Sequence, residues 1–248
     1  MVLARHLGVS GHSLIRARDC KITPPVPASN GRAKTAAPML NKFERIRLVR
    51  YLGLNTEDSV LVESEADLER HAVFLANCER YSVRTFRPGL DTPYEPHFPI
   101  VSADEFELDC LPLLDRGYSL IVANGIDPVE ALVAGCIWTR ARDYLIEAAI
   151  GPGTVRRVTH LGEIDLSVRV SGSMHMAAPP EIRGALSMLE ETEHTWATDV
   201  DLKDVLYEFS VYRSAVGWAQ DRVIFWEIRG LDRQDSVLER FYRQAVEA

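Results

Sequence analysis

The sequence predicts an α+β protein. Helical and strand patterns are mixed in the first half of the chain, and a strand-rich half follows with helices at its end. This order differs from the strict alternation of strand and helix that builds a doubly wound parallel sheet. The chain contains neither a G-x-G-x-x-G sequence nor a P-loop, so the sequence does not support a Rossmann or Walker-type nucleotide site.

The first half combines periodic apolar segments with short strand-like runs. From Lys42 onward, apolar residues recur at three-residue spacing up to Leu52, which predicts a helix that ends at Gly53. Ser64 is a candidate N-cap for a second helix. The other elements expected here are the strand Ser59–Glu63, the helix Glu65–Cys78, the strand Tyr81–Phe86, a proline-rich loop Pro88–Pro99, a helix at Asp104–Leu114 and the strand Ser119–Ala123.

The second half is dominated by short apolar runs separated by turn residues. Two of these runs, Leu206–Tyr212 and Val223–Arg229, lie near the C-terminus. The remaining elements expected are the strands Leu132–Trp138 and Tyr144–Ala149, a tight turn at Gly151-Pro152-Gly153, the strands Val155–His160 and Ile164–Val170, the helix Pro180–Glu193 and a closing helix at Asp235–Glu247.

Length and charge narrow the class of protein. A chain of 248 residues is long enough for one large domain or two small lobes. Its net charge of −8 argues against a surface that binds nucleic acid. Residues 1–38 contain six basic residues and one acidic residue, several prolines and little apolar pattern, so we expect a disordered basic tail there. We expect the N-terminal lobe to span residues 39–118 and the C-terminal lobe residues 119–248.

The sequence offers no sign of a membrane protein or of a zinc site. No apolar run is long enough to span a bilayer, and no signal-peptide pattern is present. The cysteines are scattered without C-x-x-C spacing, and no His or Cys pair has the spacing of zinc ligands. We therefore expect a cytoplasmic protein with free thiols at Cys20, Cys78, Cys110 and Cys136.

Two apolar runs near the C-terminus each carry one carboxylate. Leu206–Tyr212 contains Glu208, and Val223–Arg229 contains Glu227. If the runs form a hairpin centred near Gly217, the two carboxylates lie directly opposite each other, and like charges in that position destabilise a sheet. A cation would remove the repulsion, and Mg²⁺ is typically held by one or two carboxylates plus substrate phosphates. The pair therefore indicates a nucleotide–metal site.

A structural explanation of Glu227 stays open beside the metal site. Strand alternation places Glu227 on one face with Val223, Phe225 and Arg229, and this apolar company favours burial. A buried carboxylate needs a partner, and Arg229 could supply one as a plain ion pair.

Six stretches, in this order, resemble the ATP-grasp nucleotide-binding domain of the group formed by phosphoenolpyruvate synthase, pyruvate phosphate dikinase and rifampicin phosphotransferase. They cover roughly residues 40–230 and are NKFERIRLVRYLGL, YSVRTFRPG, SLIVANGIDP, AGCIWT, IEAAIGPG and the closing YEFSV…IFWEIR. The resemblance implies a two-lobed ATP-grasp-like domain with mixed or antiparallel sheets, and ATP and Mg²⁺ as cofactors.

Carried over position by position, the resemblance also implies roles for single residues. Lys42 and Arg84 would contact ATP phosphates, and Asn124 and Ile126 would line the adenine hinge. Glu208 and Glu227 would bind Mg²⁺, and Arg229 would lie near the transferred phosphate. We take Arg84 and Arg229 as the candidate catalytic residues.

The chain departs from the family pattern at three places. Glu227 stands where the family has glutamine, and Leu206 stands where it has an acidic residue. The glycine-rich segment that covers the phosphates is replaced by the proline-rich Arg87–Pro99. No phosphohistidine or phosphoenolpyruvate-binding domain follows, so we do not expect a complete synthase or dikinase reaction.

Several candidate residues have a plain structural alternative. Arg84 could be a solvated edge arginine, although arginine forks pair well with phosphate oxygens. Lys42 could be a surface lysine at a helix start. We expect Glu147 to ion-pair with one of the arginines that, together with His160, form a predicted basic cluster. These arginines are Arg140, Arg142, Arg156 and Arg157.

Two functions from different classes remain. The first is phosphoryl transfer from Mg·ATP to a small molecule or to a histidine of a separate protein, by positioning and charge neutralisation. An ATP-dependent ligase that acts through an acyl phosphate is a variant of it. The second is a degenerate, non-catalytic module that binds a nucleotide or a protein partner.

Overall fold

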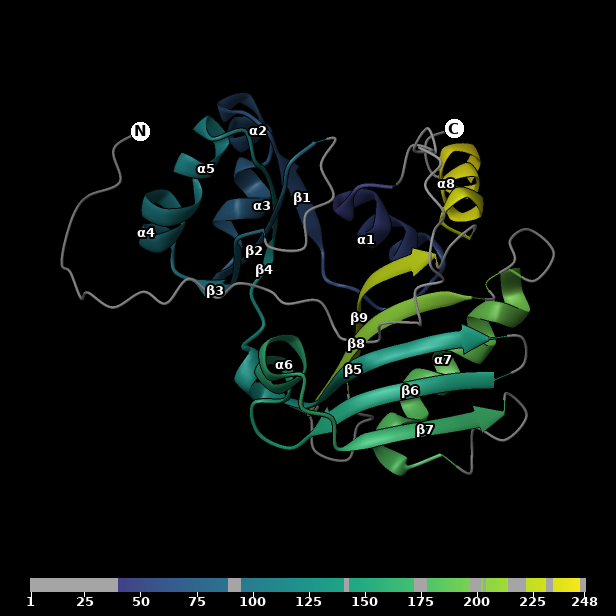
Figure 1. Ribbon diagram of the computed structural model, residues 1–248. Coiled ribbons are helices and arrows are strands. Elements are labelled where there is room, and N and C mark those ends of the chain that lie inside the picture. Colours follow the sequence, from purple (N-terminus) through teal and green to yellow (C-terminus); the bar gives the residue numbers. More distant parts are fainter. Residues whose placement is uncertain are drawn as a thin grey trace, which may run out of the picture.

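The computed structural model describes residues 40–88, 95–140, 143–171, 178–196, 202, 204–213, 222–230 and 234–245. The predicted basic tail and the centre of the C-terminal hairpin loop, with Gly217, lie outside these residues. Two antiparallel sheets form two lobes (Figure 1), which confirms the α+β prediction.

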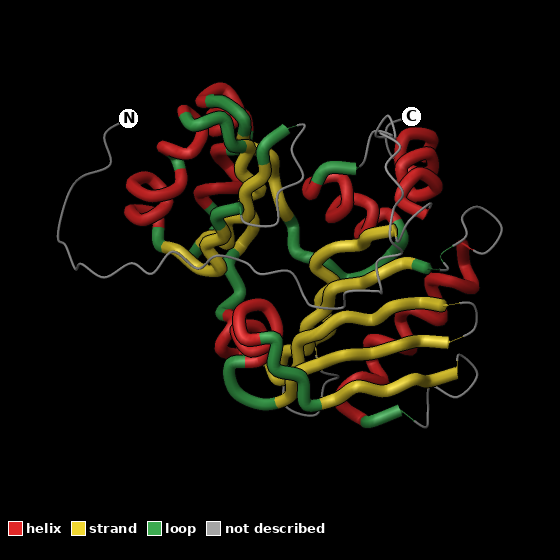
Figure 2. The backbone as a smooth tube through the Cα atoms, viewed as in Figure 1, coloured by secondary structure: helices red, strands yellow, loops and turns green. Residues whose placement is uncertain are grey.

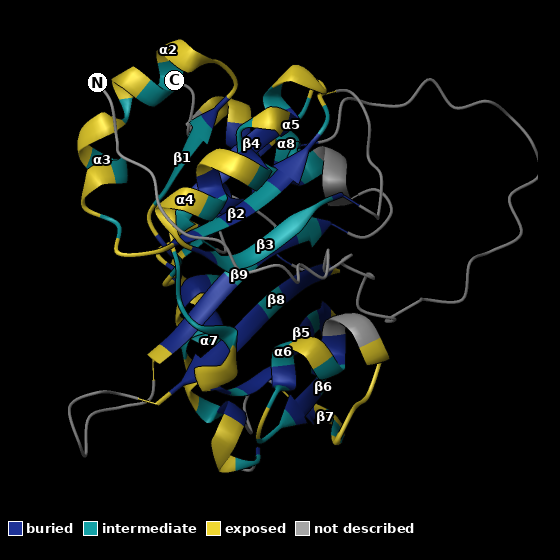
Figure 3. Cartoon of the chain, turned by 90° about the vertical axis from the view of Figure 1, so that its left-hand side faces the viewer, coloured by how far each residue is buried: buried dark blue, intermediate teal, exposed yellow. Residues whose placement is uncertain are grey.

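The N-terminal lobe is built on a four-stranded sheet with the order β1-β4-β2-β3. Its strands are β1 (Ser59–Val62), β2 (Tyr81–Phe86), β3 (His97–Val101) and β4 (Ser119–Asn124). Short helices cover one face (Figure 3). The apolar core between these helices and the sheet includes Val83, Phe106 and Leu120. These helices are α2 (Glu65–Arg70), α3 (Ala72–Ala76), α4 (Ala103–Glu105), the π-helical turn η1 (Phe106–Cys110) and α5 (Pro112–Asp115).

Two expectations for this lobe need correction. The helix predicted over Glu65–Cys78 is divided at His71 into α2 and α3. The loop predicted over Pro88–Pro99 ends early, because β3 begins at His97 and includes Pro99. Since β3 is an edge strand, Pro99 can occupy it without removing a hydrogen bond from the interior of the sheet.

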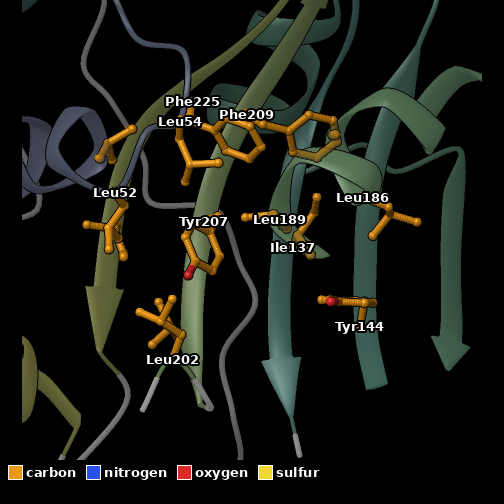
Figure 4. Packing of buried hydrophobic residues seen from close by; sticks show 14 of the residues in the cluster. Leu52, Leu54, Ile137, Tyr144, Leu186, Leu189, Leu202, Tyr207, Phe209 and Phe225 are labelled. Atoms are coloured by element: carbon orange, nitrogen blue, oxygen red, sulfur yellow. The ribbon is translucent and has the colours of Figure 1, made fainter. Parts of the chain in front are cut away.

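The C-terminal lobe is built on a five-stranded sheet with the order β7-β6-β5-β8-β9. Its strands are β5 (Ala131–Arg140), β6 (Asp143–Ile150), β7 (Leu166–Ser171), β8 (Val205–Tyr212) and β9 (Arg222–Gly230). Helix α7 (Pro180–Trp196) covers one face, where Leu186 and Leu189 meet Ile137 and Tyr207 (Figure 4). Burial of each such side chain contributes about 1.5–3 kcal/mol. The opposite face carries the polar side chains of β8 and β9.

One predicted strand of this lobe is wrong. Val155–His160 is helical, in α6 (Thr154–Arg156) and the π-helical turn η3 (Arg157–Leu161). Gly153 has a φ of 68°, which turns the chain, and the Thr154 hydroxyl then donates to the carbonyl of Ala131. These contacts stabilise a helical turn in this segment, although its β-branched residues favour a strand.

Helix α1 (Lys42–Tyr51) packs against β9, and the C-terminal helix α8 (Gln234–Ala245) packs against the same strand (Figures 1 and 2). A capping box fixes the start of α1: the Asn41 side chain accepts from the Glu44 amide, and the Glu44 carboxylate accepts from the Asn41 amide. The other oxygen of Glu44 accepts from Arg243 of α8 at 2.8 Å. The start of α1 is therefore held by α8 as well as by its own cap.

The lobes are joined by the segment that leaves β4 at Gly125. The Gly125 amide donates to the carbonyl of Arg80, and a Cβ at this position would lie 3.0 Å from the carbonyl carbon of Tyr81. Glycine therefore permits the close approach of the connection to β2. No helix in the described parts of the chain is long and apolar enough to cross a membrane.

Candidate functional site

The two carboxylates predicted to face each other do so. Glu208 of β8 is the direct antiparallel partner of Glu227 of β9. The hairpin register expected from the sequence is therefore confirmed at this pair. Both strands place these side chains on the sheet face opposite α7.

A β-bulge follows the pair. Phe209 is opposite Phe225, so Trp226 is an extra residue on β9. Phe225 and Ile228 pack into the core on the α7 side, whereas Trp226 donates to the hydroxyl of Ser210 on the other face. The expectation that Glu227 shares a face with Val223 and Phe225 is therefore wrong. Simple alternation cannot reveal a bulge, which shifts every later side chain of the strand.

Arg229 bridges the two glutamates. Its Nε lies 3.0 Å from Oε1 of Glu227 and its Nη2 lies 3.3 Å from Oε2. The same Nη2 lies 3.1 Å from Oε1 of Glu208. Arg45 of α1 places Nη1 3.2 Å from Oε1 of Glu227. The structural ion pair that the sequence left open is therefore present, with Arg45 as a second partner.

Burial and charge shift the proton equilibria of this cluster. Burial alone would raise the pKa of Glu227, but Arg229, followed by Lys42, Arg45 and Arg84, holds that pKa well below its usual range. Burial lowers the pKa of Lys42, and Arg84 and Arg229 lower it further, whereas Glu227 and Glu208 oppose the shift. Glu227 is therefore ionised, and Lys42 loses its proton more readily than an exposed lysine.

The structure brings five of the seven predicted site residues together and adds one that the sequence reasoning missed. The five are Lys42, Arg84, Glu208, Glu227 and Arg229, and the addition is Arg45. We call these six residues the charged cluster, and their formal charge is +2. Arg45 lies three residues after Lys42, and helical spacing puts the two on one face of α1, which could have revealed it.

A cleft adjoins the charged cluster at Arg84. It lies between the four-stranded sheet and β9 and is open to solvent. Ser59, Ser82 and Ala123 supply small side chains on the sheet, and the indole of Trp226 forms part of the opposite wall. Arg84 lies over that indole, with Cζ 5.0 Å from the ring centroid, and Nη1 donates to the Trp226 carbonyl at 3.4 Å. The remaining lining residues are Ile46, Thr56, Glu57 and Ile121.

The two predicted hinge residues lie at the end of β4. Asn124 is the last residue of β4 and is exposed, opposite Tyr81 of β2. Ile126 packs in a small apolar cluster with Tyr212, Ile224 and Trp226. Both residues are therefore at the connection between the lobes, near the cleft but apart from the charged cluster.

The predicted basic cluster is not assembled among the described residues. Arg157 donates to the carbonyl of Ile150, which pairs with Val133, whereas Arg140 lies seven residues further along β5, about 23 Å away. Arg157 pairs with Glu163 and Asp165 instead. Arg142 and the side chain of His160 lie outside the described residues. The predicted ion pair of Glu147 is likewise absent in the described part of the chain.

The oxygen donors of the charged cluster are the two carboxylates of Glu208 and Glu227. Within the described ranges, no group of three or more His, Cys, Asp or Glu side chains could hold a metal by itself. Two carboxylates on one face, beside basic groups that suit phosphates, fit the pattern in which the substrate supplies the remaining ligands. The residues therefore fit a magnesium ion that is bound together with a polyphosphate.

Comparisons with solved structures find partial similarity to several proteins at low sequence identity. The chain is similar to N5-carboxyaminoimidazole ribonucleotide synthetase in complex with ADP, with 11% identity and a TM-score of 0.48 over 85% of this chain and 51% of that one. It is also similar to D-alanine-D-alanine ligase from Helicobacter pylori, with 14% identity and a TM-score of 0.45 over 83% and 60%.

A third similar structure is the RiPP-associated ATP-grasp ligase of Chryseobacterium gregarium in complex with ADP and a leader and core peptide. Its identity is 11% and its TM-score 0.42, over 83% of this chain and 59% of that one. This chain thus spans 51–60% of the length of these three structures. No family model and no curated protein matches the chain. Similarity at this level carries nothing about ligand or reaction.

Proposed function

We propose that this protein is an ATP-grasp-like enzyme that binds Mg·ATP between its lobes and transfers the γ-phosphoryl group. The observation that carries the proposal is the charged cluster, which has a formal charge of +2 and lies at the end of a cleft between two antiparallel sheets. A surplus of arginine and lysine in a confined position favours a polyanion.

The base would lie in the cleft and the phosphates on the charged cluster. The base would lie beside the indole of Trp226 and the small side chains of Ser82 and Ala123, which line the cleft. Asn124 and Ile126 would border it at the connection between the lobes. Arg84 lines the cleft and belongs to the charged cluster, so it would bind the phosphates at the point where the cleft meets the cluster.

The catalytic contribution of the chain is positioning and charge neutralisation. Lys42, Arg84 and Arg229 would contact phosphate oxygens, and Arg229 would exchange its contact with Glu208 for the transferred group. The carboxylate pair of Glu208 and Glu227 marks the place where Mg²⁺ would bind, and Mg²⁺ neutralises phosphate charge when bound.

An oxygen or nitrogen of the acceptor would form a bond to the γ-phosphorus. The bond between the γ-phosphorus and the β–γ bridging oxygen would break, and ADP would leave with that oxygen. If the acceptor is a carboxylate, the product is an acyl phosphate and the reaction is the first half of a ligation. If it is a histidine of a separate protein, the product is a phosphohistidine. Hydroxylamine traps only the acyl phosphate as a hydroxamate, so candidate acceptors can be sorted by that product.

A non-catalytic nucleotide-binding module is the second candidate. The observation that favours it is the occupation of both Glu227 oxygens by arginines. Turnover of ATP to ADP with any acceptor would exclude it.

Calorimetry with ATP and ADP, with and without Mg²⁺, tests nucleotide binding. We expect Arg84→Gln to weaken binding about tenfold or more, because it removes a charged hydrogen-bond donor. Arg169→Gln is the matched control, since Arg169 forms an exposed pair with Asp143 on β6 and β7. Absence of nucleotide binding by the unmodified protein, or equal effects of both variants, would overturn the proposal.

A further inference from the structure

The two carboxylates of the charged cluster have unequal surroundings. Glu227 is only 1% exposed, and both of its oxygens are hydrogen-bonded to arginines. The Glu208 side chain is 27% exposed, and its contact with Arg229 uses Oε1. The two residues are therefore placed for different tasks, although the strands pair them directly.

Glu227 holds two guanidinium groups that come from different elements. Arg45 arrives from α1, and Arg229 lies two residues further along β9. The Arg45 side chain is 9% exposed, so its charge needs a nearby counter-charge. Arginine forks are directional, which means that the carboxylate fixes where their remaining N–H groups point.

The cluster as a whole disfavours a free cation. Four basic side chains surround the two glutamates, and Arg229 takes up the space between the carboxylates. A divalent ion approaching without a counter-anion would meet a region of formal charge +2. A polyphosphate would neutralise that charge and draw Arg229 toward its own oxygens.

We propose that Glu227 is a positioning residue that orients Arg45 and Arg229 toward polyphosphate, and that Glu208 is the carboxylate of the pair that contacts the divalent cation. This assignment rests on the proposed function of the same site. It follows that polyphosphate binds without metal, and that the cation joins only after the polyphosphate.

Affinity for ADP, measured by calorimetry in EDTA and in Mg²⁺, separates the two roles. The relevant quantity is the ratio of the two dissociation constants, which reports the gain from the metal. We expect Glu208→Gln to reduce this ratio to about one. Glu227→Gln should leave the ratio unchanged while altering the affinity in both conditions. A ratio that falls as far in Glu227→Gln as in Glu208→Gln would overturn the assignment.

Tripolyphosphate in EDTA tests the arginines without a base and without a metal. We expect saturable binding to the unmodified protein, weaker by about tenfold or more in Arg45→Gln and not weaker in Glu208→Gln. Arg45→Gln keeps the test valid if Glu227→Gln fails to fold. Lack of tripolyphosphate binding, or full affinity in Arg45→Gln, would refute the positioning role.

The two probes also separate this inference from the proposed function. Tripolyphosphate binding with the expected response to Arg45→Gln, combined with no binding of ADP or ATP, would remove the nucleotide proposal and keep the role of the arginines. Manganese measured by electron paramagnetic resonance gives an independent readout. Saturable Mn²⁺ binding at the glutamates of the protein without polyphosphate would contradict the order of binding.

Discussion

Replacement of Glu227 by glutamine tests the energetic role of the buried carboxylate. The substitution keeps the shape of the side chain and removes its charge, so Arg45 and Arg229 lose their shared counter-charge in a nearly dry position. Breaking a buried pair by removing one partner costs about 3–5 kcal/mol. We expect the lower end, about 3 kcal/mol at pH 7, because the amide oxygen still accepts a hydrogen bond.

Glu208→Gln is the matched control, since it is the cross-strand partner with a more exposed side chain and should cost less than about 1 kcal/mol. Urea unfolding at pH 7 gives both values from the midpoint at constant slope. A loss of about 3 kcal/mol corresponds to a fall in Tm of about 6–12 °C for a protein of this size. Equal effects of the two variants would refute the distinction drawn between the carboxylates.

The stability difference between the unmodified protein and Glu227→Gln should depend on pH, because folding lowers the pKa of Glu227. The folded protein holds the pKa of Glu227 below its value in the unfolded chain, which is about 4.3. The stabilisation from its charge is thus present above about pH 4.3 and is lost as the pH falls toward the folded-state pKa. The stability gap between the unmodified protein and Glu227→Gln should therefore narrow below pH 4. A gap that stays constant from pH 7 to pH 3 would contradict the electrostatic explanation.

Three further outcomes are expected. Gly135→Ala should destabilise the protein by about 3 kcal/mol or more in urea unfolding, because the new Cβ would lie 2.2 Å from the carbonyl oxygen of Glu147. Gly184→Ala is the control: its Cβ would lie 3.3 Å from Cγ2 of Val223, and the free energy of unfolding should change by less than about 1 kcal/mol. Ala123→Phe should fill the cleft and abolish ADP binding in calorimetry while tripolyphosphate still binds; equal loss of both would argue against a base in the cleft. Lys42 should be protected from acylation by ADP in peptide mapping at pH 8, where its lowered pKa leaves more of its amine uncharged; labelling of Lys42 that ADP does not change would count against its place at the phosphates.

The sequence predicted most elements of regular structure, because their apolar spacing is set by local periodicity. It also predicted the pairing of Glu208 with Glu227, since a hairpin with a short connection restricts the register. The bulge at Trp226 was not predictable, because an inserted residue leaves no mark in the alternation. The helical turn at Thr154 was missed for another reason: its stability comes from contacts with β5 and β6 rather than from local propensity.

The site itself was predicted only where residue type and position agreed. Lys42, Arg84 and Arg229 came from motif positions, and they converge on Glu227. Arg45 was missed because its only signal was its helical spacing from Lys42, and its partner Glu227 is 182 residues away along the chain. Trp226 was missed because the bulge that turns it toward Arg84 leaves no mark in the alternation of β9. The predicted basic cluster failed for the converse reason, since residues close in sequence lie at opposite ends of a long strand.

The carboxylate of Glu44 connects helix α8 to the start of α1, although α8 supplies no residue of the charged cluster. One oxygen of Glu44 caps α1 and the other receives Arg243, so the last helix of the fold steadies the turn that presents Lys42 and Arg45. Under the proposed function, any protein or ligand that pulls α8 away from β9 would loosen that turn and weaken phosphate binding at the charged cluster. Helix α8 is thus a place where a bound molecule could inhibit the proposed function without occupying the charged cluster.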